Sequence, residues 1–138
     1  MEKELVKTRA MQQQTMEELS EKIRDQIVKA MRMGRTLALD FGKLKADFTN
    51  ELSRANAFEA EMVFDRERFW DEDEYLKIVR QHEMHTAYGL NPGSFIMLPT
   101  FNIVVVSSSP DPEFIEYMLD NLPHRDQFAM YKVHKKGV

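Results

Sequence analysis

The sequence predicts an α/β domain: a small, mostly parallel sheet with covering helices, one β-hairpin and a long N-terminal amphipathic helix. The first observation is the apolar, β-branched run at residues 103–106, which leaves no polar face and is typical of a strand covered on both sides. The second is the alternation of helix-like and strand-like segments, which favours parallel strands joined by helices. The third is the stretch from residue 2 to about 33, which lacks Gly and Pro and has a strongly helical composition.

The composition indicates one folded domain and argues against several functional classes. A chain of 138 residues is long enough for one domain with a real core. Its net charge of −4 argues against a partner that is nucleic acid or a membrane surface, because both attract basic proteins. Cysteine is absent, which excludes disulfides and fits a reducing, cytoplasmic location. We recognise neither a signal peptide nor a span of roughly 20 apolar residues.

The N-terminal segment, residues 1–33, carries an apolar stripe that is clear from Met16 onward and weaker before it. Two interpretations follow: a helix that packs on its own domain, residues 34–138, or an arm that docks on a partner or pairs with itself. Thr15 and Glu18 also have the spacing of a capping box, which would start a second helix. The candidate partner-binding residues are Leu5, Met11, Met16, Leu19, Ile23 and Ile27.

The first half of the α/β domain is expected to begin after a glycine. Gly34 has the position of a helix C-cap, and Gly42 should end the strand that follows. Acidic residues at 71–74 complement the positive end of a helix dipole and indicate a helix start. The elements predicted in order are a strand at 36–41, a helix at 43–55, a strand at 61–65, a linking turn or helical turn at 66–70 and a helix at 71–81.

The second half is expected to contain the hairpin and the last helix. The pair 95–98 and 101–106 is separated by Pro99 and Thr100, which predicts a hairpin whose second arm is the central strand. Asp111 followed by proline is an N-cap signal for a helix at 112–121. Alternation over 128–134 predicts a last strand, and a basic tail follows it.

Polar residues at the ends of the predicted strands form a candidate ligand rim, because ligands of open α/β sheets bind beyond the carboxyl ends of the strands. The same residues are also expected at strand ends without any site. An anion there would be opposed by Asp111, which should cap the following helix itself. The rim residues are Asp40, Asp65, Ser107, Ser108, Ser109 and His134.

We find no complete catalytic or cofactor motif, so we expect no enzyme activity and no cofactor. His82 and His85 are three residues apart, whereas the helical zinc motif needs a spacing of four, so a metal site would require a distant acid as well. Surface histidines at a helix end are the simpler interpretation. The P-loop, the Gly-x-Ser-x-Gly elbow and the Gly-x-Gly-x-x-Gly fingerprint are all absent.

Two segments resemble a known family. Residues 30–39, a helix end, Gly34 and an apolar strand, resemble a late segment of the AAA+ modules in dynein heavy chains. Residues 98–107 resemble their sensor strand, and the predicted elements at 112–121 and 128–134 follow in the same order, so the resemblance covers about 27–136.

This resemblance to AAA+ modules implies a degenerate, structural derivative. Asp40 resembles the Walker B aspartate, Phe41 stands in place of the catalytic glutamate, and Ser107 matches the polar sensor. Without a P-loop, such a module is not expected to hydrolyse ATP by itself. The resemblance implies a subunit of a microtubule-associated or ciliary assembly.

We therefore expect a non-catalytic assembly protein, held in a larger complex by its helical arm and its α/β domain. The location expected is cytoplasmic, cytoskeletal or ciliary. The alternative is a small nucleotide- or anion-binding domain, or an enzyme, that uses the strand-end rim.

Overall fold

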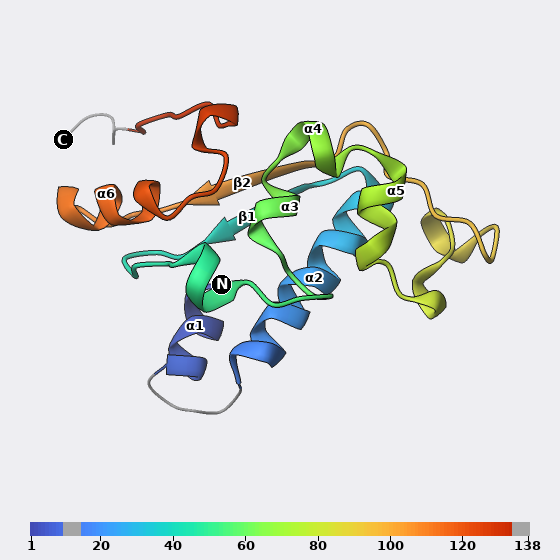
Figure 1. Cartoon of the computed structure of the whole chain (residues 1–138), viewed down its shortest axis with the longest axis horizontal. Helices are drawn as coiled ribbons and strands as arrows, with labels where there is room; N and C mark the ends of the chain where they lie inside the picture. Colours follow the sequence, from blue (N-terminus) through green and yellow to red (C-terminus); the bar gives the residue numbers. More distant parts are fainter. Residues whose placement is uncertain (10–14, 134–138) are drawn as a thin grey trace.

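The computed structural model describes residues 1–9 and 15–133, and these fold as a mixture of helix and sheet (Figure 1). The sheet is smaller than the sequence predicts, because only two of the predicted strands form among the described residues. The α-helices and strands are α1 (Glu2–Arg9), α2 (Met16–Met33), β1 (Thr36–Asp40), α3 (Ala60–Val63), α4 (Arg66–Phe69), α5 (Glu72–Tyr75), β2 (Asn102–Val106) and α6 (Pro112–Asp120). A π-helical turn at Phe48–Leu52 and 3-10 turns at Leu76–Ile78, Gln81–Glu83, Ala87–Gly89 and Arg125–Gln127 complete the set.

Helix α2 begins and ends where the sequence predicts a helix to do so. The Thr15 hydroxyl accepts a hydrogen bond of 3.2 Å from the backbone N–H of Glu18, which fixes the first turn. Gly34 ends the helix in the left-handed conformation, with φ 64°, and the Arg35 N–H then bonds to the Ala30 carbonyl at 2.9 Å. The two ends confirm the second helix start at Thr15 and the glycine C-cap.

The sheet consists of β1 and β2, which run parallel with Thr36 opposite Asn102 and Asp40 opposite Val106. The predicted parallel pairing is therefore confirmed for these two strands. The predicted hairpin is wrong, since residues 95–98 form no strand. Instead, the Leu98 N–H bonds to the Met31 carbonyl at 3.0 Å, so this segment is held on the end of α2.

The chain between the two strands differs most from the prediction. The helix expected at 43–55 is reduced to the π-helical turn, the strand expected at 61–65 is α3, and the helix expected at 71–81 is broken after Ile78. At 66–70 the second of the two predicted alternatives, a helical turn, is confirmed and forms α4. Bulky side chains from these short elements and from the loops between them are buried in the interior, so tertiary packing and not local periodicity determines the backbone here. Four of them are the fully or nearly fully buried Phe48, Phe58, Phe64 and Phe69.

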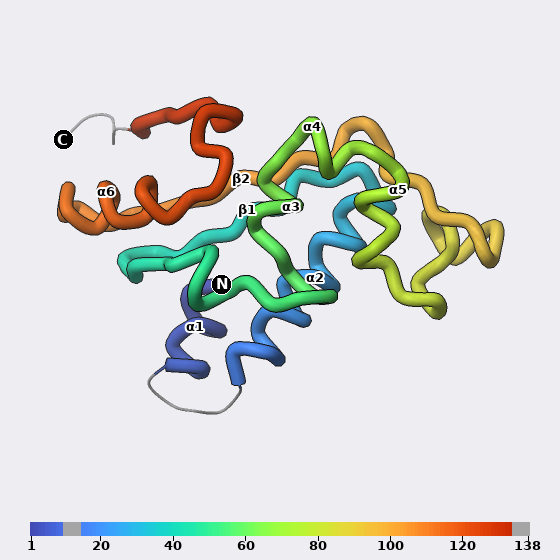
Figure 2. Tube along the Cα trace, in the orientation of Figure 1, coloured from blue at the N-terminus to red at the C-terminus, as the bar shows by residue number. Residues whose placement is uncertain are grey.

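The C-terminal part confirms one prediction and overturns another. Helix α6 starts at Pro112 after the Asp111 cap, as predicted. Met118 is buried in this helix, whereas Ile115 is exposed. Residues 128–133 form no strand, contrary to the prediction, and His134 lies outside the described residues. In the Cα trace the chain after α6 doubles back along the same end of the molecule, opposite to the 84–93 loop (Figure 2).

One hydrophobic core joins the two N-terminal helices to the rest of the described chain. Leu5 of α1 and Ile23 and Ile27 of α2 are completely buried with Leu39 of β1 in this cluster. Phe64 lies at its centre, in edge-to-face contact with three rings at centroid distances of 5.3–5.7 Å: Phe48, Phe58 and Phe128.

Candidate protein-docking surface

The sheet is covered on one face and open on the other. Leu37, Leu39, Ile103 and Val105 are buried or half-buried and pack against the core. The intervening residues of both strands point away from it, because side chains alternate between the two faces of a sheet. This outward face is exposed at every position except the half-buried Val106. Its residues are Thr36, Ala38, Asp40, Asn102, Val104 and Val106, and together with the outer edge of β2 we call them the open sheet surface.

The outer edge of β2 presents backbone groups that no other strand takes up. Asn102 donates to the Arg35 carbonyl at 3.2 Å, and the Val106 carbonyl accepts from Phe41 at 3.1 Å, so the even-numbered residues face β1. Ile103 and Val105 therefore direct their N–H and C=O groups to the outside. In the part of the chain that the structure describes, no backbone partner bonds to these two residues. Such an edge is a template for an added strand.

Four residues of the predicted polar rim, Asp40 and Ser107–Ser109, lie together at the ends of β1 and β2, but their donors and acceptors are used locally. Asp40 accepts from the Gly42 N–H at 2.8 Å, and Ser109, which is buried, accepts from the Asp111 N–H at 3.2 Å. The Asp111 carboxylate caps α6 through the Glu113 N–H at 2.9 Å. Ser107 and Ser108 are exposed beside the end of β1, where the Ser108 N–H bonds to the Gly42 carbonyl at 2.8 Å. Asp65 lies apart and caps α4.

The candidate partner residues of the N-terminal segment lie mainly inside the molecule. Leu5, Leu19, Ile23 and Ile27 are completely buried, and Met16 is half-buried against the same core. Met11 lies outside the described residues. A partner could not reach the buried side chains in this conformation, which agrees with the interpretation of a helix packed on its own domain.

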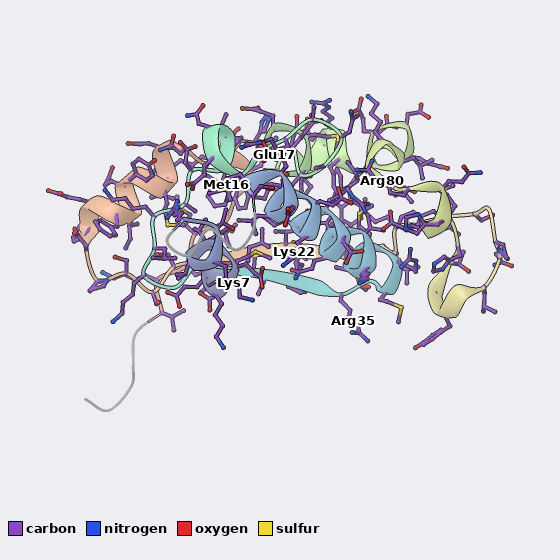
Figure 3. All side chains as sticks on the ribbon, turned by 90° about the horizontal axis from the view of Figure 1, so that it is seen from below. Lys7, Met16, Glu17, Lys22, Arg35 and Arg80 are labelled. Carbon is purple, nitrogen blue, oxygen red and sulfur yellow. The ribbon has the colours of Figure 1, made fainter. Side chains whose placement is uncertain are left out.

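The outward side of the helix pair is charged (Figure 3). Lys22 of α2 pairs with Glu4 of α1 at 2.8 Å. Glu17 pairs with Arg54 at 3.2 Å on another side of α2, because it stands about 140° around the helix from Lys22. Lys29 pairs with Asp25 one turn along α2, also at 2.8 Å. This side is therefore a solvated, ion-paired face.

A buried ion pair fastens the 76–85 segment to α2. The Arg24 guanidinium bonds to the Glu83 carboxylate at 2.7 and 3.2 Å and to the Ile78 carbonyl at 2.7 Å. Arg32, about two turns further along α2, donates to the Glu83 carbonyl at 2.8 Å. Burial by itself would raise the pKa of Glu83, but the hydrogen bonds from Arg24 and from the Arg80 N–H outweigh it and hold that pKa below its ordinary value. The polar groups of Arg24 and Glu83 have hydrogen-bond partners within the protein, so we assign the ion pair a structural role.

The histidines at 82 and 85 do not form a metal site with a distant acid among the described residues, since no group of three or more His, Asp or Glu side chains has that arrangement there. His82 is exposed, and the His85 ring lies 3.0 Å from the Thr86 carbonyl.

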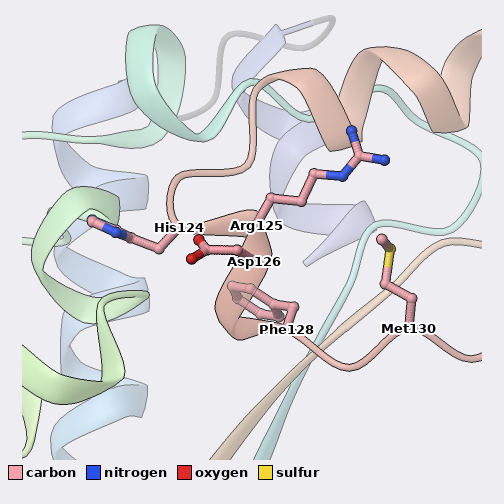
Figure 4. A pocket seen from close by; sticks show the side chains of 5 residues that line it. All are labelled: His124, Arg125, Asp126, Phe128 and Met130. Atoms are coloured by element: carbon pink, nitrogen blue, oxygen red, sulfur yellow. The ribbon is translucent and has the colours of Figure 1, made fainter.

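A shallow hollow lies beside the C-terminal segment and is lined by side chains of residues 124–130 (Figure 4). His124 lies 3.1 Å from the Glu61 carboxylate, and Gln127 donates to Asp65 at 3.1 Å while accepting from the Arg66 N–H at 2.7 Å. The Gln127 bond is the main reason that the pKa of Asp65 lies below its ordinary value. The hollow is open, and these contacts hold the segment in place instead of forming a pocket.

Comparisons with protein-family models, with curated proteins and with solved structures find no match. The helices of residues 1–9 and 15–133 include none that is long and apolar enough to cross a bilayer. The geometry of the open sheet surface is therefore the main guide to function.

Sequence reasoning missed the open sheet surface because the run at 103–106 looks like a doubly covered strand. Val104 is 40% exposed, and the burial of β2 alternates. Asn102 at the start of the run was the available sign that one face of this strand meets solvent. The alternation over 128–134 likewise predicts a strand, but it does not identify the neighbouring strand with which these residues would pair.

Proposed function

We propose that this chain is a non-catalytic assembly protein, a subunit of a larger complex that docks on another protein chain through the open sheet surface. The observation that carries the proposal is the two-stranded parallel sheet with one bare face and an unpaired outer edge on β2. Parallel sheets normally have both faces covered, and two strands alone are marginal in water. A protein partner that adds a strand or covers Ala38 and Val104 would supply what the sheet lacks.

The charged side of the helix pair is a second contact region in this proposal. Partner binding through residues 1–33 would use the exposed Lys22 and Lys29, because most apolar side chains of these helices are committed to the core. Such contacts would add specificity and speed of association more than affinity.

The resemblance to dynein AAA+ modules supports a search for the partner among microtubule-associated and ciliary proteins of the cytoplasm. In this view the chain is a degenerate module that keeps a sheet scaffold and lacks the loop that grips a triphosphate. The alternative, a nucleotide- or anion-binding site or an enzyme at the strand-end rim, has less support. Asp40 and Asp111 already occupy backbone N–H groups there, and their negative charges would oppose a phosphate.

The experiment is affinity capture with three full-length baits: the natural chain, Val104→Lys and Tyr88→Lys. Val104 lies on the open sheet surface, whereas Tyr88 is 85% exposed in the 84–93 loop at the other end of the molecule. We expect the natural chain and Tyr88→Lys to capture the same proteins, identified by mass spectrometry, and Val104→Lys to lose them. Equal capture by all three baits would contradict docking at the sheet. Loss of capture by Tyr88→Lys would place the contact elsewhere.

A further inference from the structure

The segment after Phe128, residues 129–133, forms neither helix nor strand and displays apolar side chains to solvent. Met130, Tyr131 and Val133 are 54%, 87% and 92% exposed. Phe128, where the segment begins, has an extended backbone with φ −94° and ψ 133°. Within the described part of the chain, residues 129–133 form no backbone hydrogen bond. The sequence pattern of a strand is therefore present, but the neighbouring strand is missing.

The same chain also carries an edge that lacks a strand. Ile103 and Val105 of β2 direct their backbone groups outward, and β2 has five residues, the length of the exposed segment. The edge of β2 lacks a neighbouring strand, and residues 129–133 lack a strand to pair with. We propose that two copies of the chain exchange residues 129–133, so that this segment of each copy pairs with the outer edge of β2 in the other. The inference rests on the proposed function and names a second copy as the partner.

The contacts before the segment favour a second copy over the chain's own β2. Phe128 packs edge-to-face on Phe64 at 5.3 Å, Gln127 bonds to Asp65 and to the Arg66 N–H, and His124 lies against Glu61. These contacts tie residues 124–128 to α3 and α4. The segment that follows is therefore directed away from the core, and it can pair with another molecule while all of these contacts are kept.

The distribution of charge favours a parallel arrangement. The chain after Phe128 contains Lys132, Lys135 and Lys136 and no acidic residue. The carboxyl end of β2 leads into α6, which carries an acidic cap and three further acids: Asp111, Glu113, Glu116 and Asp120. The other end of β2 lies beside Arg35. Parallel addition places the basic end of the donated strand near the acids, whereas antiparallel addition would place it near Arg35.

A reciprocal exchange also closes the assembly. Each copy donates one strand and accepts one, so a two-fold axis relates the two contacts and no edge of β2 is left to recruit a third copy. The product is two three-stranded parallel sheets, in which Tyr131 and Val133 exchange solvent for contact with neighbouring side chains.

The first test uses the absence of cysteine from the natural chain. Val104→Cys and Tyr131→Cys are made as separate full-length variants, mixed and oxidised. We expect a disulfide-linked species of twice the chain mass, because both positions lie at the centres of their strands. The matched control pairs Val104→Cys with Tyr88→Cys. Tyr88 is as exposed as Tyr131 but lies at the opposite end of the molecule, so little linked product is expected.

The second test measures the mass of the natural chain in solution by light scattering. We expect a dimer, and we expect Tyr131→Pro combined with Lys132→Pro to give monomer. Alternate N–H groups of a strand face its neighbour, so two consecutive prolines remove one pairing donor in either register. Residues 131 and 132 are exposed in the single chain, so its fold should survive, as circular dichroism would check.

Two results would overturn the exchange. One is a chain carrying both cysteines that forms its disulfide at monomer mass, which would show that the segment docks on its own β2. The other is a natural chain that stays monomeric without any cross-link between mixed variants. In either case, loss of protein capture by Val104→Lys would still support the proposed function, so the two failures are distinguishable.

Discussion

Arg24 and Glu83 show how single residues decide the shape of the middle of the chain. Their side chains are 3% and 9% exposed, and the guanidinium joins the Glu83 carboxylate to the Ile78 carbonyl. Glu21, at the surface end of the cluster, bonds to both Arg24 and Arg80. Removing one partner of a buried pair leaves an uncompensated charge, which costs more than the intact pair contributes. The irregular 76–85 segment therefore depends on one residue of α2.

We predict that Glu83 makes stability depend on acid. Its pKa in the folded protein is below the ordinary value of 4.5, so the folded state favours the ionised carboxylate. The stability from this group is present above about pH 4.5 and is lost as the pH falls through the lower folded value. Glu83→Gln should lower the free energy of unfolding by about 3 kcal/mol at pH 7 and flatten its decline in acid.

Urea titrations at pH 7 and pH 3 check this prediction, with the exposed Glu113→Gln as the control. A Glu83→Gln variant as stable as the natural chain at pH 7 would show that the pair is not holding the segment.

Gly34 is a second residue on which the fold depends. Its φ of 64° disfavours a side chain, and an added Cβ would clash with Thr100 Oγ1 and approach Leu98 Cβ to 3.0 Å. We predict that Gly34→Ala destabilises the protein by about 2–4 kcal/mol, from backbone strain and displacement of the 98–100 turn together. Gly89→Ala is the matched control, since Gly89 has φ 72° but open space around it, and should cost about 1 kcal/mol. Equal losses in thermal unfolding would mean that strain alone matters.

At the level of elements, α2 organises the molecule. It packs against β1 and supplies Arg24 and Arg32 to the 76–85 segment, and its Ser20 hydroxyl accepts from the Phe58 N–H at 3.1 Å. Strand β1, the 76–85 segment and the loop at Phe58 are therefore all held by α2. A substitution that destabilises the first turn of α2 should therefore lower the stability of all three regions.

We predict that Thr15→Ala lowers the free energy of unfolding by about 1 kcal/mol, because it removes the acceptor for the Glu18 N–H. Thr15→Ser keeps a hydroxyl at the same place and should retain most of the stability. Chemical unfolding followed by circular dichroism measures both. A serine variant as weak as the alanine variant would indicate that the methyl group, and not the cap, is important.

The same elements explain what the sequence could predict. Helices α2 and α6 and strand β1 carry their own signals: Thr15 and Asp111 as caps, Gly34 as a stop, and apolar periodicity between them. The chain from 43 to 101 carries one such signal, the acids at 71–74 where α5 starts. Much of its backbone is held by distant partners such as Arg24 and Ser20, which no local pattern reveals. Of the predicted rim residues, Asp40 and Ser107–Ser109 lie at the ends of β1 and β2, whereas Asp65 does not. The open face of β2 was hidden by four apolar residues in a row, and only Asn102 before them pointed to it.

At the scale of the whole molecule, Phe64 connects three parts of the chain that are separate in sequence. Its ring contacts Phe48 from the π-helical turn, Phe58 from the loop before α3, and Phe128 from the chain after α6. Phe48 and Phe58 are completely buried, but Phe128 is half-buried at the surface. The C-terminal segment is therefore attached to the core at its edge, which is where an exchanged strand would begin.

We predict that Phe64→Ala costs about 3–5 kcal/mol of folding free energy, because it removes a buried ring at the centre of a packed cluster. Phe128→Ala should cost less, since that ring is partly in solvent. In the double variant the two losses should fall short of additivity by about 0.5–1.5 kcal/mol, the range for an aromatic pair in direct contact. Urea unfolding of the four proteins measures this coupling. Strict additivity would mean that the segment after α6 is not attached to the core through these rings, and the argument that it is directed toward a second copy would then lose its structural basis.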